Sequence, residues 1–141
     1  RQIGSLVVAY REEWEGAGKH GLPWEMGLPR IIRKVVPDEE EKNYLECPID
    51  RNRAHYFDMY PFNTPEEEKD LKSREYLIRR VPQWLKHVKK MKERSIIFMC
   101  QWHYTPRSRY DRQYAIGLLL NGEAVERWGW RDPIEFVFWE D

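Results

Sequence analysis

The segment 114–130 constrains the fold more than any other part of the sequence. Two runs rich in apolar residues flank the dipeptide Asn121-Gly122, which is the strongest short-range indicator of a tight β-hairpin turn. A turn of two residues places Leu118 opposite Val125 on the paired strands. The sequence therefore predicts an antiparallel hairpin in its last third, and other segments have to supply the partners of that hairpin.

Neighbouring segments predict further strands and helices. Residues 95–104 and 134–139 are rich in apolar and aromatic side chains, which is typical of strands. Thr64 is followed by a proline and, three positions on, by a glutamate, and this pattern predicts the start of a helix. Pro82 is expected to end that helix and to open a second one that runs to about residue 94.

These elements define a fold class. Together with a short helix capped by Ser5, they predict a single α+β domain over residues 1–141, in which two or three helices precede a three- to four-stranded antiparallel sheet. A chain of 141 residues can bury a core without disulfides or metals. The longest apolar run, 114–120, is far shorter than the roughly 20 residues of a transmembrane helix, so no membrane span is expected.

Residues 22–63 form a long stretch without helical or strand-like periodicity, apart from a candidate short strand over 31–36. Five of the nine prolines lie in this stretch, and irregular segments of such length are uncommon inside a compact domain. The stretch also carries aromatic residues, which bury large areas when they dock. We therefore expect an extended, aromatic-rich docking arm that lies across the protein's own surface or a neighbour's. Its partner-binding candidates are Tyr56, Phe57, Tyr60 and Phe62.

The net charge of the chain is zero, but the charges are segregated along it. Residues 71–112 contain twelve basic and three acidic residues, whereas 37–70 contain four basic and eleven acidic ones, and 113–141 contain two basic and six acidic ones. Two explanations stay open. The blocks neutralise one another within the fold, or the basic block binds an external polyanion or an acidic partner.

Aromatic residues are interleaved with the basic block toward its end. A helix that follows Pro82 places lysines four positions apart on one exposed stripe, and arginine pairs with phosphate or carboxylate and stacks on aromatic rings. Such a surface suits RNA, whose bases stack on aromatic side chains, and it suits protein interfaces equally well. An ordinary solvated helix face is the third explanation. The partner-binding candidates of this block are Lys86, Lys89, Lys90, Arg94, Trp102, Tyr104, Arg107, Arg109, Tyr110 and Arg112.

Motifs for cofactor or metal chemistry are weak. The run 16–21 matches G-x-G-x-x-G, but no buried strand precedes it and no helix start follows it, so a turn is favoured over a nucleotide site. Cys47, His55, Cys100 and His103 are the donor types of a zinc site. Residues three apart on a strand face opposite sides of a sheet, however, which separates Cys100 from His103. The sequence therefore predicts no cofactor and no metal, and Cys100 is expected to be a buried free thiol.

Catalytic patterns are also weak, because the chain has four serines, two threonines and no G-x-S-x-G. We expect a non-catalytic structural subunit of a larger assembly, such as an organellar ribosome or a respiratory complex, which docks on other protein subunits or on RNA through the arm and the basic face. A free-standing RNA-binding module is the alternative. A small enzyme that uses Cys100, His103 or Asp58 is the third hypothesis.

The cell compartment is an expectation from cysteine content and from the first residue. Two cysteines and no Asn-x-Ser/Thr site favour a reducing, intracellular environment. The chain starts with Arg rather than Met, and removal of a transit peptide would explain that start. The mitochondrial matrix is therefore the candidate compartment.

Overall fold

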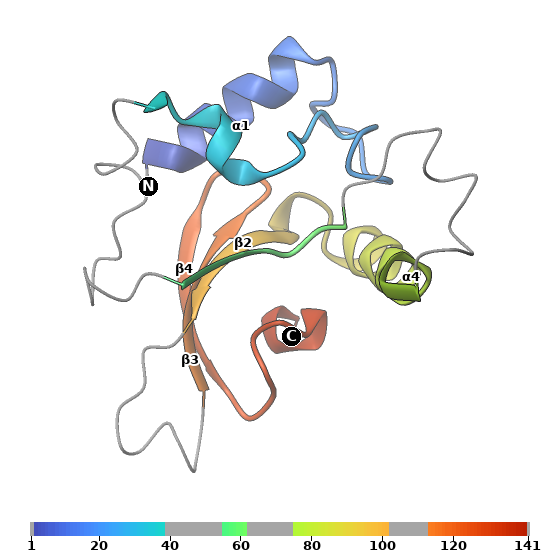
Figure 1. Cartoon of the computed structure of the whole chain (residues 1–141), viewed down its shortest axis with the longest axis vertical. Coiled ribbons are helices and arrows are strands. Elements are labelled where there is room, and N and C mark those ends of the chain that lie inside the picture. The colour runs from blue at the N-terminus through green and yellow to red at the C-terminus, as the bar shows by residue number, and fades with distance from the viewer. Residues whose placement is uncertain (1, 39–54, 62–74, 102–112, 141) are drawn as a thin grey trace.

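The computed structural model describes residues 2–38, 55–61, 75–101 and 113–140. The strands in these ranges form one antiparallel sheet in the order β1-β2-β3-β4, and helices accompany them (Figure 1). The predicted α+β class is confirmed. In chain order the described elements are α1 (Gln2–Glu13), η1 (Ile32–Val35), β1 (His55–Asp58), α4 (Glu75–Met91), η4 (Lys92–Arg94), β2 (Ile96–Gln101), β3 (Gln113–Leu119), β4 (Ala124–Gly129) and η5 (Phe136–Trp139).

Helical elements cover the sheet from two directions. α4 and the 3-10 helix η5 pack together beside the strands, and α1 lies across the end of the sheet that holds the hairpin turn (Figure 1). The backbone of Gly4 in α1 lies so close to that of Gly122 in the turn that a β-carbon would not fit between them. On the α4 side, Trp139 of η5 packs against Gly117 in the middle of β3.

One hydrophobic cluster joins the sheet to these helical elements. Burying a large apolar side chain contributes about 1.5–3 kcal/mol, so the cluster supplies most of the stability of the fold. Its largest fully buried members are Trp84, Met26, Ile32, Met59, Ile96, Ile97, Met99 and Leu120.

The predicted hairpin is present, but its register differs by one residue from the predicted one. Val125 lies opposite Gly117 instead of Leu118. The loop contains three residues rather than two, and within it the Gly122 amide donates to the Leu119 carbonyl at 2.9 Å. Gly122 has a φ of +89°, the left-handed conformation that closes a three-residue hairpin loop. The Asn-Gly pair therefore predicted the position of the turn correctly, but it predicted the number of residues in the loop incorrectly.

The described parts of the predicted arm pack into the protein's own core. Met26 and Ile32 are fully buried, and residues 55–58 form β1, which pairs with β2 and was not predicted. The strand expected over 31–36 is wrong, because this segment forms η1. Residues 39–54 and 62–63 of the arm lie outside the described ranges.

Two helix starts differ from the predicted ones. α1 begins at Gln2, so Ser5 lies inside the helix and does not cap it. Pro82 lies inside α4 and does not end it. Interior proline costs a helix about 3 kcal/mol, but Trp84 and Val88 on the same helix are buried to 0% and 1% exposure, and their burial outweighs that cost. The helix start predicted at Thr64 lies outside the described residues.

The last predicted strand is a 3-10 helix. Residues 136–139 form η5 rather than a strand. Its three buried side chains are Phe136, Phe138 and Trp139, and a strand would have directed the last two to opposite faces. The tighter helical turn brings all three onto the core.

Candidate interaction surface

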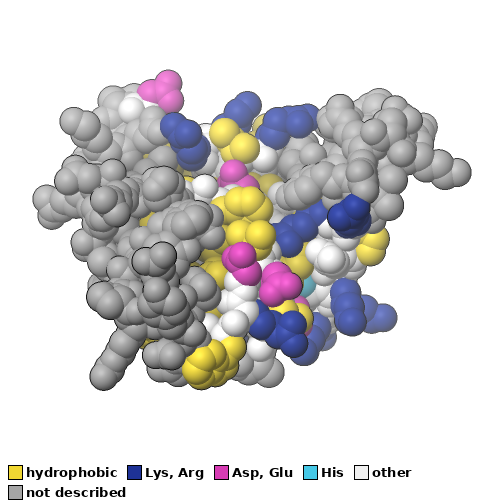
Figure 2. Space-filling view, turned by 60° about the horizontal axis from the view of Figure 1, so that its bottom comes forward, with side chains coloured by type: hydrophobic (Ala, Val, Ile, Leu, Met, Phe, Trp, Pro, Cys, Tyr) yellow, Lys and Arg dark blue, Asp and Glu magenta, His cyan; other side chains and the backbone are white. Residues whose placement is uncertain are grey.

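α4 carries lysines on one side and core residues on the other. Trp84 and Val88 are buried, whereas Lys86, Lys89 and Lys90 are exposed. We call these three residues the α4 lysine face. Figure 2 shows Lys and Arg side chains gathered to the right of a stripe of hydrophobic side chains, in the region where Figure 1 places α4. The predicted exposure of these lysines is confirmed.

Two of the predicted basic residues make ion pairs with glutamates from the acidic segment 113–141. Lys90 Nζ lies 3.4 Å from Glu140 Oε1, and Arg94 lies 3.1 Å from Glu123 Oε2. Both basic side chains are more than half exposed, so solvent screens the pairs and they contribute little to stability. Lys86 and Lys89 make no ion pair with any residue in the described ranges. Among the described residues, the acidic segment 113–141 thus neutralises Lys90 and Arg94 but not Lys86 or Lys89.

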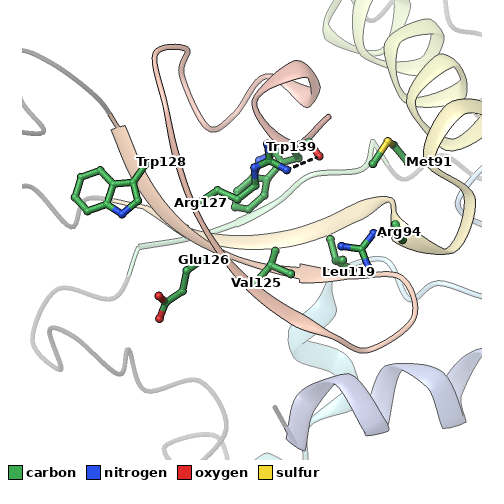
Figure 3. Close-up of a pocket in the computed structure, with 8 residues that line it drawn as sticks. All are labelled: Met91, Arg94, Leu119, Val125, Glu126, Arg127, Trp128 and Trp139. Carbon is green, nitrogen blue, oxygen red and sulfur yellow. Dashed lines mark hydrogen bonds between the residues drawn. The ribbon is translucent and has the colours of Figure 1, made fainter. Parts of the chain in front are cut away.

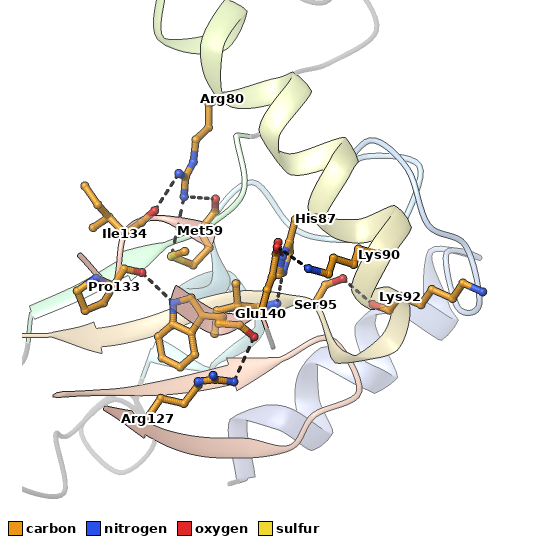
Figure 4. A network of polar contacts seen from close by, with 12 residues as sticks. Met59, Arg80, His87, Lys90, Lys92, Ser95, Arg127, Pro133, Ile134 and Glu140 are labelled. Carbon is orange, nitrogen blue, oxygen red and sulfur yellow. Dashed lines mark hydrogen bonds and ion pairs between the residues drawn. The ribbon is translucent and has the colours of Figure 1, made fainter. Parts of the chain in front are cut away.

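A buried histidine holds α4 against the sheet and the C-terminal segment. His87 Nε2 accepts a hydrogen bond from the Ile96 amide at 2.9 Å, which leaves Nδ1 to donate to Glu140 Oε2 at 2.6 Å. The ring also stacks on Phe136, with 4.9 Å between centroids. Burial lowers the pKa of His87, and the hydrogen bond to Glu140 opposes this effect. The His87 ring is therefore neutral in the folded protein, and its two hydrogen bonds have a structural role (Figure 4).

Arg80 makes a second connection between α4 and the C-terminal segment. One terminal nitrogen donates to the Ile134 carbonyl and the other to the Met59 carbonyl, each at 2.9 Å. Its guanidinium also lies 3.9 Å from the centroid of the Phe136 ring, a cation–π geometry. Arg80 and His87 together fix the orientation of α4, and hence of the lysines on its outer side (Figure 4).

The aromatic candidates of the arm contact the protein itself. Tyr56 and Phe57 are half-buried in β1, and Tyr56 stacks on Phe98 at 5.0 Å between centroids. Tyr60 is buried, and its hydroxyl donates to the Pro29 carbonyl at 2.7 Å. Burial raises the pKa of Tyr60 well above its ordinary value of 10.0. Tyr60 therefore packs in the protein's own core, and its role in partner binding stays a prediction.

Seven predicted partner-binding residues lie outside the described ranges, so the structure assigns them no position. They are Phe62, Trp102, Tyr104, Arg107, Arg109, Tyr110 and Arg112.

The residues considered for metal binding and catalysis do not form a site in the described part of the chain. Cys100 is buried in β2, Cys47 and His103 lie outside the described residues, and no group of three or more metal-ligating side chains occurs among those that are described. Asp58 Oδ1 accepts a hydrogen bond from the Ile32 amide at 3.0 Å, and burial raises the pKa of this carboxyl. Asp58 thus anchors η1 to β1.

The glycine run 16–21 is a turn that a buried arginine holds in place. Arg11 Nε donates to the Met26 carbonyl at 2.8 Å, and a terminal nitrogen donates to the Gly16 carbonyl at 3.0 Å. The other terminal nitrogen forms an ion pair with Glu93 at 3.1 Å. Sequence reasoning missed Arg11, because an arginine near a helix end gives no indication that it will be buried.

Comparison with protein-family models, with curated proteins and with solved structures finds no match to the chain. Within the described ranges, no helix combines the length and the apolar character that crossing a membrane requires.

Proposed function

We propose that the protein is a non-catalytic subunit of a larger assembly and that the α4 lysine face contacts its partner. The observation that carries the proposal is the positive charge of this face, where Lys86 and Lys89 make no ion pair with a described residue and Lys90 pairs with Glu140 at 3.4 Å. Like charges on adjacent helical turns repel one another, and a negatively charged partner removes this repulsion. An organellar ribosome or a respiratory complex is the kind of assembly that would supply such a partner.

The buried contacts beneath α4 support the same proposal. His87 and Arg80 tie the helix to β2, Met59 and the C-terminal segment. A face that is already fixed in orientation loses little conformational entropy when it binds. The lysines therefore stand on a rigid base, as a preformed docking surface requires.

The test is affinity capture with the full chain as bait, followed by mass spectrometry. The variant that replaces Lys86, Lys89 and Lys90 by Gln should recover at least tenfold less of the partner than the wild type. Its melting temperature should stay within about 2 °C, because exposed charges contribute little to stability. A matched control replaces the exposed residues Lys19, Lys34 and Arg131 by Gln, which changes the net charge equally and should leave capture unchanged.

Two outcomes would contradict the proposal. Equal losses in both variants would show that net charge, and not the α4 lysine face, determines binding. Recovery of RNA without any protein subunit would favour a free-standing RNA-binding module, in which each lysine–phosphate contact contributes about 0.7–0.9 to the slope of log affinity against log salt concentration.

A further inference from the structure

β4 is an edge strand of the sheet that the described residues form. Hydrogen-bonded and non-hydrogen-bonded pairs alternate along an antiparallel ladder, and the Leu119 amide donates to the Glu123 carbonyl at 2.8 Å where β4 begins. The backbone amides and carbonyls of Ala124, Glu126 and Trp128 therefore point away from β3. Ala124 and Glu126 are exposed, so the outer side of β4 offers their backbone groups to another strand.

A groove runs along each face of this edge. The first has a volume of about 630 Å³, and Val125 and Arg127 of β4 line it together with Leu119 and Trp139 (Figure 3). The second has a volume of about 470 Å³ and includes Ala124 of β4. Side chains of an extended peptide alternate between the two faces of a sheet. A peptide added to β4 would therefore place successive side chains in the two grooves.

The first groove combines an apolar floor with positive charge. Arg94 and Arg127 line it beside Leu119, Val125 and Trp139. Figure 3 shows the Glu126 carboxylate directed away from Arg127. Arg94 pairs with Glu123, but because both side chains are largely exposed, an incoming carboxylate can replace Glu123 at little cost.

Exposed tryptophans extend the apolar surface at the end of the strand. Trp130 is 75% exposed and Trp128 is 45% exposed, although the Trp128 ring contacts the Tyr114 ring in a tilted arrangement with 4.7 Å between centroids. Tryptophan is enriched among the residues that dominate protein interfaces. Trp128 lies in β4 and Trp130 follows its last residue, so both rings extend the apolar surface at this end of the strand.

We infer that β4 receives an extended segment of a partner protein, which adds a fifth strand to the four-stranded sheet and places acidic side chains in the groove lined by Arg94 and Arg127. The inference rests on the proposed function, because it names the second contact that a protein partner makes. Backbone hydrogen bonds along the edge supply affinity, and the acidic side chains select the register.

The test measures amide hydrogen exchange by NMR on the full chain with a seven-residue peptide that alternates valine with glutamate. At saturation, the outward amides of Ala124 and Glu126 should exchange at least tenfold more slowly. The amides of Val125 and Arg127, which already bond to β3, should change little. A matched peptide with lysine in place of glutamate should bind at least tenfold more weakly, and Arg94→Gln should reduce the affinity for the glutamate peptide several-fold.

A proline variant supplies an independent test of the edge. Glu126→Pro removes an amide that makes no bond to β3, so it should abolish peptide binding while the fold persists; if this variant does not fold, the exchange measurement on the wild type decides alone. Absence of protection at Ala124 and Glu126 overturns the inference, as does equal binding of the lysine peptide. Slowed exchange at these amides without peptide, rising with protein concentration, overturns it in favour of a second copy.

A further measurement distinguishes failure of the β4 inference from failure of the proposed function. The variant of the α4 lysine face should bind the glutamate peptide within twofold of the wild type, because none of its three lysines lines the groove. If the peptide instead perturbs only the amides of α4, the β4 inference is wrong while the proposed function stands.

Discussion

Replacing His87 by leucine tests whether α4 is held rigidly against the sheet. The variant loses the hydrogen bond that Nε2 accepts from the Ile96 amide at 2.9 Å and the one that Nδ1 donates to Glu140 at 2.6 Å. Each buried polar group left without a partner costs about 1–3 kcal/mol. Leucine recovers part of this loss through apolar contact with Phe136. We expect the free energy of unfolding to fall by about 2–4 kcal/mol.

Urea denaturation followed by tryptophan fluorescence and circular dichroism measures this loss. The matched control is Gln83→Leu, which puts the same side chain on an exposed position of the same helix and should change the free energy of unfolding by less than about 0.5 kcal/mol. If His87→Leu is as stable as that control, the contacts of His87 do not hold α4, and the rigid base of the α4 lysine face loses its main support.

The same histidine predicts a dependence of stability on pH. Burial lowers the pKa of His87 below its ordinary value of 6.5, although Glu140 opposes the shift. The unfolded chain therefore binds the proton more tightly than the folded chain. The contribution of His87 is complete above pH 6.5 and is lost as the pH falls from 6.5 toward the lower pKa of the folded state. The variant His87→Leu should lack this part of the pH profile, and an unchanged profile would refute the assignment.

Three further substitutions test the packing and turn geometry. Gly122→Val should destabilise the fold by at least about 1–2 kcal/mol, because valine has to adopt a φ near +89°; thermal melting measures it. Gly117→Ala should cost about 1–3 kcal/mol in urea denaturation, since its β-carbon would lie 2.5 Å from the Trp139 ring. Arg80→Lys should lower the free energy of unfolding by about 1–3 kcal/mol, because lysine cannot reach two carbonyls while stacking on Phe136.

Local sequence patterns predicted the elements that are determined by residues close together in the sequence. The hairpin follows from the Asn-Gly pair, and the exposed lysines of α4 follow from the helical period. The register of the hairpin did not follow, because a two-residue type I′ loop requires positive φ at both Asn121 and Gly122, and only Gly122 adopts it. Pro82 was misread for a different reason: tertiary burial of Trp84 outweighs a local preference.

Long-range pairing accounts for most of what the sequence did not predict. His87 and Glu140 are 53 positions apart, and Arg11 and Glu93 are 82 apart. No periodicity or composition window relates residues at such separations. The edge position of β4 is also a property of the complete sheet, because it depends on which strand pairs with β3 on its other side. The α4 lysine face could therefore be predicted from the sequence, and the groove beside β4 could not.

The two surfaces meet at Arg94. This residue follows α4 directly in η4, and it lines the groove beside β4 together with Met91, the last residue of the helix. A partner that contacts both surfaces therefore crosses a continuous strip from Lys86 through Arg94 to β4. Once one contact has formed, the other becomes effectively intramolecular, and the combined affinity exceeds that of either contact. A variant that removes one of the two surfaces should therefore weaken binding to the assembly far more than expected from the affinity of that surface for an isolated peptide.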